Sequence, residues 1–273
     1  MRIARASAYA LLSYRCPDLI GSYYAGERGA DHGVEYLVSG ISTAVVAPSY
    51  FDPPRTGVQA YVVRHRDHVI LCVRGTDEII DVARDLQAFP VKMGGCPVHV
   101  DGRVRVHAGI RAQADVLMSH CVPHIERSAR LARSASAGAQ PLIQCVGHSA
   151  GGMAAGIIAL RLAAAFPRDV SLVTLGSPPV GNRHFVEASH DQLAGVMHIV
   201  NGDDPVPALR AGFCHGDRAD VVRIGHRRVG ARFSLSLSLA DHAASSYLSS
   251  ALVMGDPKGG WGGSPPGWGR PLD

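Results

Sequence analysis

The sequence has little charge and few aromatic residues, and it lacks the patterns that mark several functional classes. Charged residues make up 18% and aromatic residues 6% of its 273 positions, and the formal net charge is only +4. The lysines and arginines form no stripe interleaved with aromatic side chains, which argues against a nucleic-acid-binding protein. The six cysteines contain no C-x-x-C pair and no zinc-ligand spacing, and nothing in their order favours a disulfide framework. We therefore expect neither a metal nor an organic cofactor.

The sequence also lacks a stretch typical of a membrane span. Residues 134–160 contain no Asp, Glu, Lys or Arg, but their polar side chains and glycines indicate a buried core segment. Met1–Tyr14 has two arginines ahead of a short apolar patch, as a signal peptide would. Four of its residues nevertheless share one helical face, which predicts an amphipathic helix instead: Ile3, Ala6, Ala10 and Tyr14. We therefore expect a cytoplasmic protein by default, with export by a non-Sec route as the alternative.

What the sequence does contain is an alternation of short apolar runs and helical patterns from residue 58 onward. Val58–Val63 and Val69–Val73 predict an antiparallel hairpin, and residues 110–133 predict a long helix. Three later runs predict further strands: Val170–Leu175, Gly195–Val200 and Val221–Ile224. This alternation is typical of an α/β protein with a mostly parallel central sheet. We expect one domain over residues 1–254 and a flexible Gly/Pro/Trp-rich tail over residues 255–273.

One stretch, Gly147-His148-Ser149-Ala150-Gly151, has the pattern of a catalytic motif. It follows an apolar run that begins at Pro141 and precedes an Ala/Ile/Leu segment with helical spacing, so it predicts a tight turn between a strand and a helix. A Gly-x-Ser-x-Gly sequence in this context is typical of a nucleophile elbow, whose glycines let strand and helix approach closely. The alternative is a tight glycine turn with an inert serine.

A serine nucleophile requires a histidine base and a carboxylate that orients the histidine. In α/β-hydrolases these partners follow the serine in the order acid, then histidine, on loops at the carboxyl ends of strands. Asp203 and Asp204 directly follow a predicted strand, and both are candidates for the acid. His215 and His226 lie in polar stretches, whereas His242 begins the last helical segment and is the best-placed base.

Six stretches, in order, resemble motifs of the class 3 lipase family, which includes the fungal triacylglycerol lipases. In chain order they are Val73–Thr76 (F-R-G-[ST]), His107–Ile110 (V-H-x-G-F), Gly147–Gly152 (G-H-S-L-G-G), Thr174–Asn182 (T-F-G-x-P-R-V-G-N), Asn201–Pro207 (N-x-x-D-x-V-P), and His242 with Tyr247. The resemblance implies an α/β-hydrolase fold with helices on both faces of the sheet. It also implies that Ser149 is the nucleophile, that Asp204 rather than Asp203 is the acid, and that His242 is the base.

The same resemblance implies how the oxyanion of the reaction would be held. The backbone N–H of Ala150 would act together with the backbone and hydroxyl of Thr76. The amphipathic segment Asp77–Leu86 stands where the family has its lid helix, and a fixed surface helix is an equal alternative.

These expectations describe a serine ester hydrolase, a lipase or carboxylesterase, that cleaves acyl esters of lipids through an acyl-enzyme intermediate. Its partner would be a lipid or acyl-ester substrate, met at a lipid–water interface if Asp77–Leu86 is a mobile lid. One alternative keeps the chemistry and makes the protein an exported phospholipase that acts on membranes. Another is a catalytically silent binding module that uses the Gly/Trp-rich tail.

Overall fold

The computed structural model describes residues 2–14, 46–51, 59–64, 68–75, 90–95, 102–135, 138, 140–209, 213–214, 220–226 and 235–254. Four sequence predictions fall outside these residues: Thr76, the amphipathic segment Asp77–Leu86, His215 and the tail over residues 255–273.

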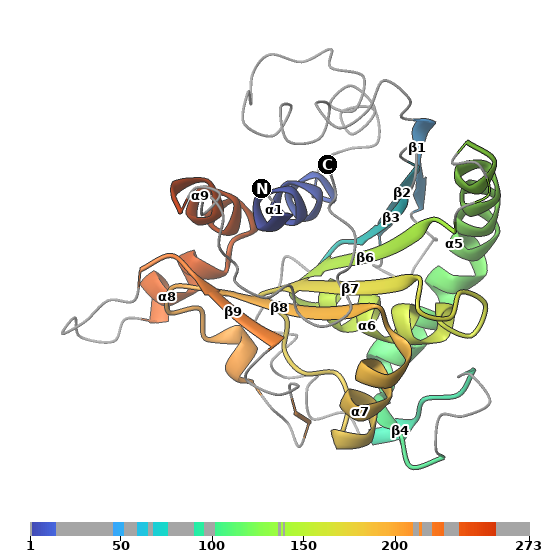
Figure 1. Cartoon of the computed structure of the whole chain (residues 1–273). Helices are drawn as coiled ribbons and strands as arrows, with labels where there is room; N and C mark the ends of the chain where they lie inside the picture. The colour runs from blue at the N-terminus through green and yellow to red at the C-terminus, as the bar shows by residue number, and fades with distance from the viewer. Residues whose placement is uncertain are drawn as a thin grey trace.

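Within the described part of the chain, seven strands form a central sheet, shown in Figure 1. Their spatial order is β1 (Val46–Phe51), β2 (Ala60–Arg64), β3 (His68–Val73), β6 (Leu142–His148), β7 (Val170–Leu175), β8 (Gly195–Asn201) and β9 (Val221–Ile224). The first three strands pair antiparallel, and every pairing from β3 to β9 is parallel. The predicted hairpin and the predicted α/β-hydrolase type of fold, with its mostly parallel sheet, are therefore confirmed.

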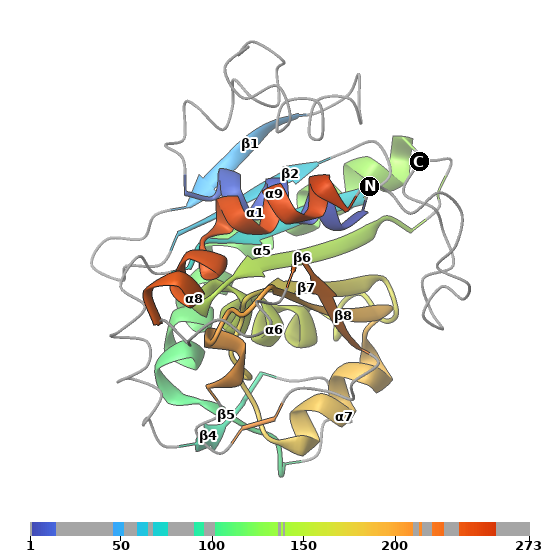
Figure 2. The same ribbon diagram turned by 90° about the vertical axis from the view of Figure 1, so that its left-hand side faces the viewer.

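Helices cover both faces of this sheet, as Figures 1 and 2 show from two directions. Helices α1 (Arg2–Leu12) and α9 (Ala244–Val253) lie on one face, and α5 (Ala108–Ala135), α6 (Ala150–Leu162) and α7 (Arg183–Gln192) lie on the other. Strand β3 shows why both faces are filled. Val69 and Leu71 belong to the core under α5 and α6, whereas Ile70 and Cys72 belong to the core under α1 and α9. Alternate side chains of a strand point to opposite faces, so a continuous apolar run serves two cores.

Two parts of the fold differ from the sequence predictions. Helix α1 is buried on more than one side, because small residues let it pack closely between the sheet and α9. The buried residues of the helix are Ala4, Ala6, Ser7, Ala8, Tyr9, Ala10 and Leu12. The last helical segment is two helices, α8 (Leu235–His242) and α9, separated by Ala243 with φ −59° and ψ 137°. His242 therefore ends a helix and does not begin one.

A small second sheet was also missed. Strands β4 (Pro90–Lys92) and β5 (Arg105–His107) pair antiparallel in a stretch for which the sequence predicted no strand. The buried Arg161 of α6 holds this region by donating to the backbone carbonyls of Met93 and Gly94 and to the carboxylate of Asp115 in α5.

The parallel register brings the carboxyl ends of four strands to one edge of the sheet. Val73 is opposite Gly147, and His148 is opposite Leu175, while β8 ends one strand further along at Asn201. Residues that directly follow these strands therefore gather at this edge. A search of the described helices finds none that is both long and apolar enough to cross a membrane.

Candidate active site

Ser149 occupies a strained turn between β6 and α6. Its backbone has φ 54° and ψ −131°, a left-handed conformation that costs a residue with a Cβ about 1–3 kcal/mol. The turn is fixed from both sides, because the Ser149 N–H donates to the Leu175 carbonyl (2.9 Å) and the Ser149 carbonyl accepts from the Gly152 N–H (2.9 Å). The serine thus stands at the start of a buried helix, in the geometry that the Gly-x-Ser-x-Gly pattern predicts.

The two glycines of the motif are required by backbone contacts. A Cβ on Gly147 would lie 2.3 Å from the Gly151 carbonyl oxygen, and a Cβ on Gly151 would lie 2.4 Å from the Val73 carbonyl oxygen. Neither neighbour is a flexible side chain that could move aside. The elbow therefore exists only because strand and helix meet at residues without side chains.

Asp204 and His242 form a buried pair beside this turn. The Nδ1 of His242 lies 2.8 Å from Oδ2 of Asp204, and the two side chains are 1% and 0% exposed. The carboxylate also accepts the Tyr247 hydroxyl (2.6 Å, on Oδ2) and the Val206 backbone N–H (2.9 Å, on Oδ1). An ionised carboxylate only accepts hydrogen bonds, so Nδ1 of His242 carries the proton and Nε2 presents its lone pair.

Tyr247 serves as a permanent donor in this cluster. Burial, together with the charge of Asp204, raises the pKa of the Tyr247 hydroxyl well above its ordinary value. The hydroxyl therefore stays protonated and holds Asp204 in the orientation that His242 needs.

Two buried polar atoms at this edge of the sheet are not hydrogen-bonded to any part of the chain that the structure describes. Among the described residues, neither Oγ of Ser149 nor Nε2 of His242 has a hydrogen-bond partner. Both belong to the same small region, since a Cβ on Gly176 would lie 3.0 Å from Cε1 of His242, and Gly176 directly follows the Leu175 carbonyl that binds the Ser149 N–H. Buried polar groups are nearly always paired, so an unpaired hydroxyl and an unpaired imidazole nitrogen at the same edge of the sheet indicate a reaction site.

The structure separates the alternatives that the residues alone left open. Asp204, not Asp203, reaches His242, whereas the Asp203 N–H donates to the side chain of Asp241 (3.0 Å). His226 is exposed. Of the expected oxyanion donors, Ala150 is the first residue of α6, where the N–H groups of a helix have no partners within the helix. Thr76 lies outside the described residues.

The segment that leads to Thr76 can nevertheless be placed. Gly75 is buried, and a Cβ there would lie 2.6 Å from the His148 carbonyl oxygen and 2.9 Å from Cβ of Ser149. The chain therefore passes against the elbow immediately before Thr76.

Sequence reasoning gave no role to the side chain of His148, although its residue is part of the motif. Its Nε2 lies 2.7 Å from the His242 carbonyl oxygen, and its Nδ1 lies 2.7 Å from the Tyr14 hydroxyl. Burial, with a smaller contribution from His242, lowers the pKa of His148 to about 3, so the ring is neutral. No sequence pattern links Tyr14 to His148, because they are 134 positions apart.

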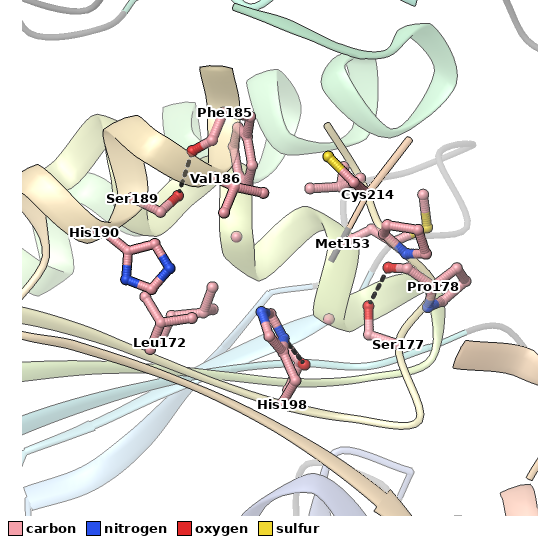
Figure 3. Close-up of a pocket in the computed structure, with 16 residues that line it drawn as sticks. Met153, Leu172, Ser177, Pro178, Phe185, Val186, Ser189, His190, His198 and Cys214 are labelled. Carbon is pink, nitrogen blue, oxygen red and sulfur yellow. Dashed lines mark hydrogen bonds between the residues drawn. The ribbon is translucent and has the colours of Figure 1, made fainter. Parts of the chain in front are cut away.

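A pocket of about 430 Å³ lies on the other side of the elbow helix, between α6, α7, β7 and β8 (Figure 3). Its walls are mainly apolar: Met153, Leu172, Val180, Phe185, Val186 and Val196. The polar side chains that line it are engaged with neighbours, since Ser177 donates to the Pro178 carbonyl and Ser189 to the Phe185 carbonyl. Neither Ser149 nor His242 lines this pocket. No group of three or more His, Cys, Asp or Glu within the described residues is arranged to hold a metal ion.

The chain is similar to known proteins in sequence and in fold. Residues 70–213 match the family described as Lipase (class 3). The chain is 32% identical over 160 residues to secreted mono- and diacylglycerol lipase 1 of Fusarium solani. The match covers 57% of this chain and 44% of that protein, so the chain spans less than half the length of this relative.

Two solved structures show the same fold. The Rhizomucor miehei lipase propeptide complex has a TM-score of 0.63 and 20% identity, over 82% of this chain and 67% of that one. Lipase II from Rhizopus niveus has a TM-score of 0.60 and 18% identity, over 83% and 80%.

The expected cytoplasmic location is wrong, because the Fusarium relative is a secreted protein. That expectation rested on interpreting Met1–Tyr14 as a helix and not as a signal peptide. Residues 2–12 do form a helix, but a helix that packs into the core carries no information about the compartment.

Proposed function

Because this chain belongs to the class 3 lipase family, we propose that it is a serine ester hydrolase that cleaves acyl esters of lipids. The observation that carries the proposal is the buried cluster at the carboxyl edge of the sheet. It consists of a strained serine with a free hydroxyl, a histidine with a free Nε2, and a carboxylate that holds the other nitrogen of that histidine.

In the acylation half of the reaction, Nε2 of His242 takes the proton of the Ser149 hydroxyl while Oγ attacks the ester carbonyl carbon. The carboxylate of Asp204 stabilises the imidazolium that forms. The negative oxygen of the tetrahedral intermediate is held by the N–H of Ala150 at the start of α6, and we assign the second donor to Thr76. The carbon–oxygen bond then breaks, and the imidazolium gives its proton to the leaving alcohol.

In the deacylation half, water replaces the alcohol. His242 takes a proton from this water as its oxygen attacks the acyl carbon, and the imidazolium then returns a proton to Oγ of Ser149 as the acid is released. The enzyme ends with the same protonation states with which it began. Every step uses side chains and backbone groups of this chain.

The substrate must reach a serine that is closed off. Ser149 is 0% exposed, so an ester carbonyl contacts Oγ only after covering residues have moved. We propose that contact with a lipid–water interface favours this movement. The substrate class would then be a lipid ester, as the name of the Fusarium relative indicates for that protein.

The test replaces Ser149 by Ala, and we expect turnover to fall by about 10⁴–10⁶-fold. Hydrolysis of p-nitrophenyl butyrate and of emulsified diacylglycerol is measured, together with labelling by a fluorophosphonate probe. The control is Ser171→Ala, which removes a second buried serine hydroxyl in β7. Ester hydrolysis by the Ser149→Ala variant within tenfold of the parent would refute the proposal.

The same assays separate the alternatives. Release of fatty acid from phospholipid vesicles at a higher rate than from diacylglycerol would identify a phospholipase. An unlabelled Ser149 and no hydrolysis of any ester by the parent protein would identify a silent binding module.

A further inference from the structure

A chain of two hydrogen bonds connects the N-terminal helix to the catalytic histidine. Tyr14 follows the end of α1 by two residues, and its hydroxyl contacts Nδ1 of His148 (2.7 Å) at the end of β6. The Nε2 of the same ring contacts the backbone carbonyl of His242 (2.7 Å) at the end of α8. The three residues come from three separate parts of the sequence and meet beside Ser149.

The direction of each hydrogen bond follows from the atoms involved. A carbonyl oxygen only accepts, so Nε2 of His148 must carry a proton. The ring is neutral and has one proton, so its Nδ1 accepts and the hydroxyl of Tyr14 donates to it. The carbonyl of His242 therefore selects the tautomer of His148, and the Tyr14 hydroxyl stabilises this tautomer by donating to Nδ1. In the other tautomer, two lone pairs would face each other across 2.7 Å in a buried site.

The carbonyl of His242 needs such a donor. His242 is the last residue of α8, and the chain turns into an extended conformation at Ala243. The carbonyls of the last helical turn have no partner within the helix. His148 supplies a donor to this carbonyl, while Asp204 holds the ring of the same residue through Nδ1. The base is thus fixed at two points, one on its backbone and one on its side chain.

The hydroxyl of Tyr14 is itself held close to the reaction site. A Cβ on Gly75 would lie 2.6 Å from the Tyr14 hydroxyl and 2.9 Å from Cβ of Ser149. The guanidinium of Arg74 lies 5.0 Å from the centre of the Tyr14 ring. The end of α1 is therefore packed against the carboxyl end of β3, and the hydroxyl has little freedom to leave His148.

We propose that His148, oriented by Tyr14, is a positioning residue that holds the backbone of His242 so that Nε2 points at Ser149. This inference rests on the proposed function, because it concerns the placement of the base in that reaction. It gives the histidine of the elbow a task distinct from filling the core. It also makes the N-terminal helix a part of the catalytic apparatus, although α1 contributes no reacting group.

The first experiment compares two replacements of His148. His148→Leu keeps an apolar side chain in the core and removes both hydrogen bonds. We expect it to lower kcat about 10–100-fold with KM changed less than about twofold, because a misplaced base slows the chemical step and not substrate binding. His148→Gln places an amide nitrogen near the position of Nε2, where it can donate to the same carbonyl. We expect the kcat of His148→Gln to be at least about fivefold higher than that of His148→Leu.

The second experiment is a double-mutant cycle with Tyr14→Phe, which removes one hydroxyl and keeps the ring. In the parent protein we expect kcat to fall about three- to tenfold with KM unchanged. In the His148→Leu background the Tyr14 hydroxyl has no imidazole to bind, so we expect its removal to cause no further loss of kcat. Thermal unfolding of each variant shows whether a loss of kcat accompanies a loss of the fold.

Each outcome decides one point. If the parent protein neither hydrolyses esters nor reacts with a fluorophosphonate, the proposed function fails, whatever the variants do. If the parent is active but Tyr14→Phe keeps full kcat, or its effect multiplies with that of His148→Leu, the positioning role is wrong. Equal kcat values for the Gln and Leu variants also overturn it. If His148→Leu does not fold, Tyr14→Phe and His148→Gln provide the test by themselves.

Discussion

Replacing Asp204 by Asn tests the central assignment of the site, because it exchanges one carboxylate oxygen for an amide nitrogen and keeps the shape of the side chain. The carboxylate accepts three hydrogen bonds, from His242 and Tyr247 on Oδ2 and from the Val206 N–H on Oδ1. An amide has one accepting oxygen and one donating nitrogen, so it cannot serve both sides.

Both orientations of the introduced amide impair the site. If its nitrogen faces Val206, two donors meet in a buried position at a cost of about 1–3 kcal/mol, and the charge that stabilises the imidazolium is gone. If its nitrogen faces His242, Nδ1 must accept and Nε2 must carry the proton. In that tautomer, Nε2 cannot take the proton of Ser149. We therefore expect kcat to fall by about 10³–10⁴-fold, equivalent to ~4–5.5 kcal/mol of transition-state stabilisation.

The measurement is kcat and KM for p-nitrophenyl butyrate, with unfolding in urea to show that the variant is folded. The matched control is Asp203→Asn, which makes the same chemical change at the neighbouring position. Asp203 does not reach His242, so we expect its replacement to change kcat by less than about threefold. The assignment is refuted if Asp204→Asn retains a kcat within tenfold of the parent, or if Asp203→Asn is the more damaging change.

Three further predictions concern the parts of the fold that support the site. Gly151→Ala would place a Cβ against backbone atoms, and we expect it to lower the free energy of unfolding by ~3–5 kcal/mol. In the control, Gly156→Ala in the same helix, the Cβ meets side chains at 3.5 Å, so the free energy of unfolding should change by no more than ~1 kcal/mol. Urea unfolding measures both. The pKa of His148 is lowered to about 3, so the unfolded chain binds more protons between pH 6.5 and 3. Stability therefore falls as pH decreases through that window, by up to ~1.4 kcal/mol per pH unit, and His148→Gln shows a shallower decrease. Arg161→Leu leaves buried carbonyls unpaired and costs ~2–3 kcal/mol, whereas Arg183→Ala, whose ion pair is exposed, leaves the melting temperature unchanged.

The core of the sheet could be predicted because its signal is local. Val170–Leu175 and Val221–Ile224 form strands with the predicted bounds, since each is a short apolar run between turn signals. Strand β7 is buried along its whole length, whereas β9 is a partly exposed edge strand. Strands β1 and β4 were missed because each contains a proline, Pro48 and Pro90. A proline argues against a central strand, but β1 is an edge strand, and Pro48 lies where its pairing with β2 shifts register, between Val46 and Ser49.

The candidate site also has a part that a local pattern predicts and a part that depends on tertiary contacts. The elbow is a local pattern, so Ser149 and its glycines were located from the residues alone. The residues left Asp203 and Asp204 open, because which of two adjacent carboxylates reaches a histidine 38 positions later depends on the turn after β8. In the structure the Asp203 N–H is engaged by Asp241, and Asp204 turns inward. Such a choice is made by tertiary contacts that have no period or spacing in the sequence.

The contacts of Tyr14 and Tyr247 are also tertiary contacts without a sequence pattern. They help to explain how the fold offsets the free-energy cost of the site. Ser149 is strained by about 1–3 kcal/mol, and two unpaired buried polar atoms add about 1–3 kcal/mol each. A local turn could not sustain these costs. Contacts from distant parts of the chain offset them. Tyr14, which follows α1, contacts His148, and Tyr247 of α9 donates to Asp204, both from the side of the sheet opposite α6. In the proposed mechanism, side chains on the face of the sheet opposite α6 therefore help to place the base.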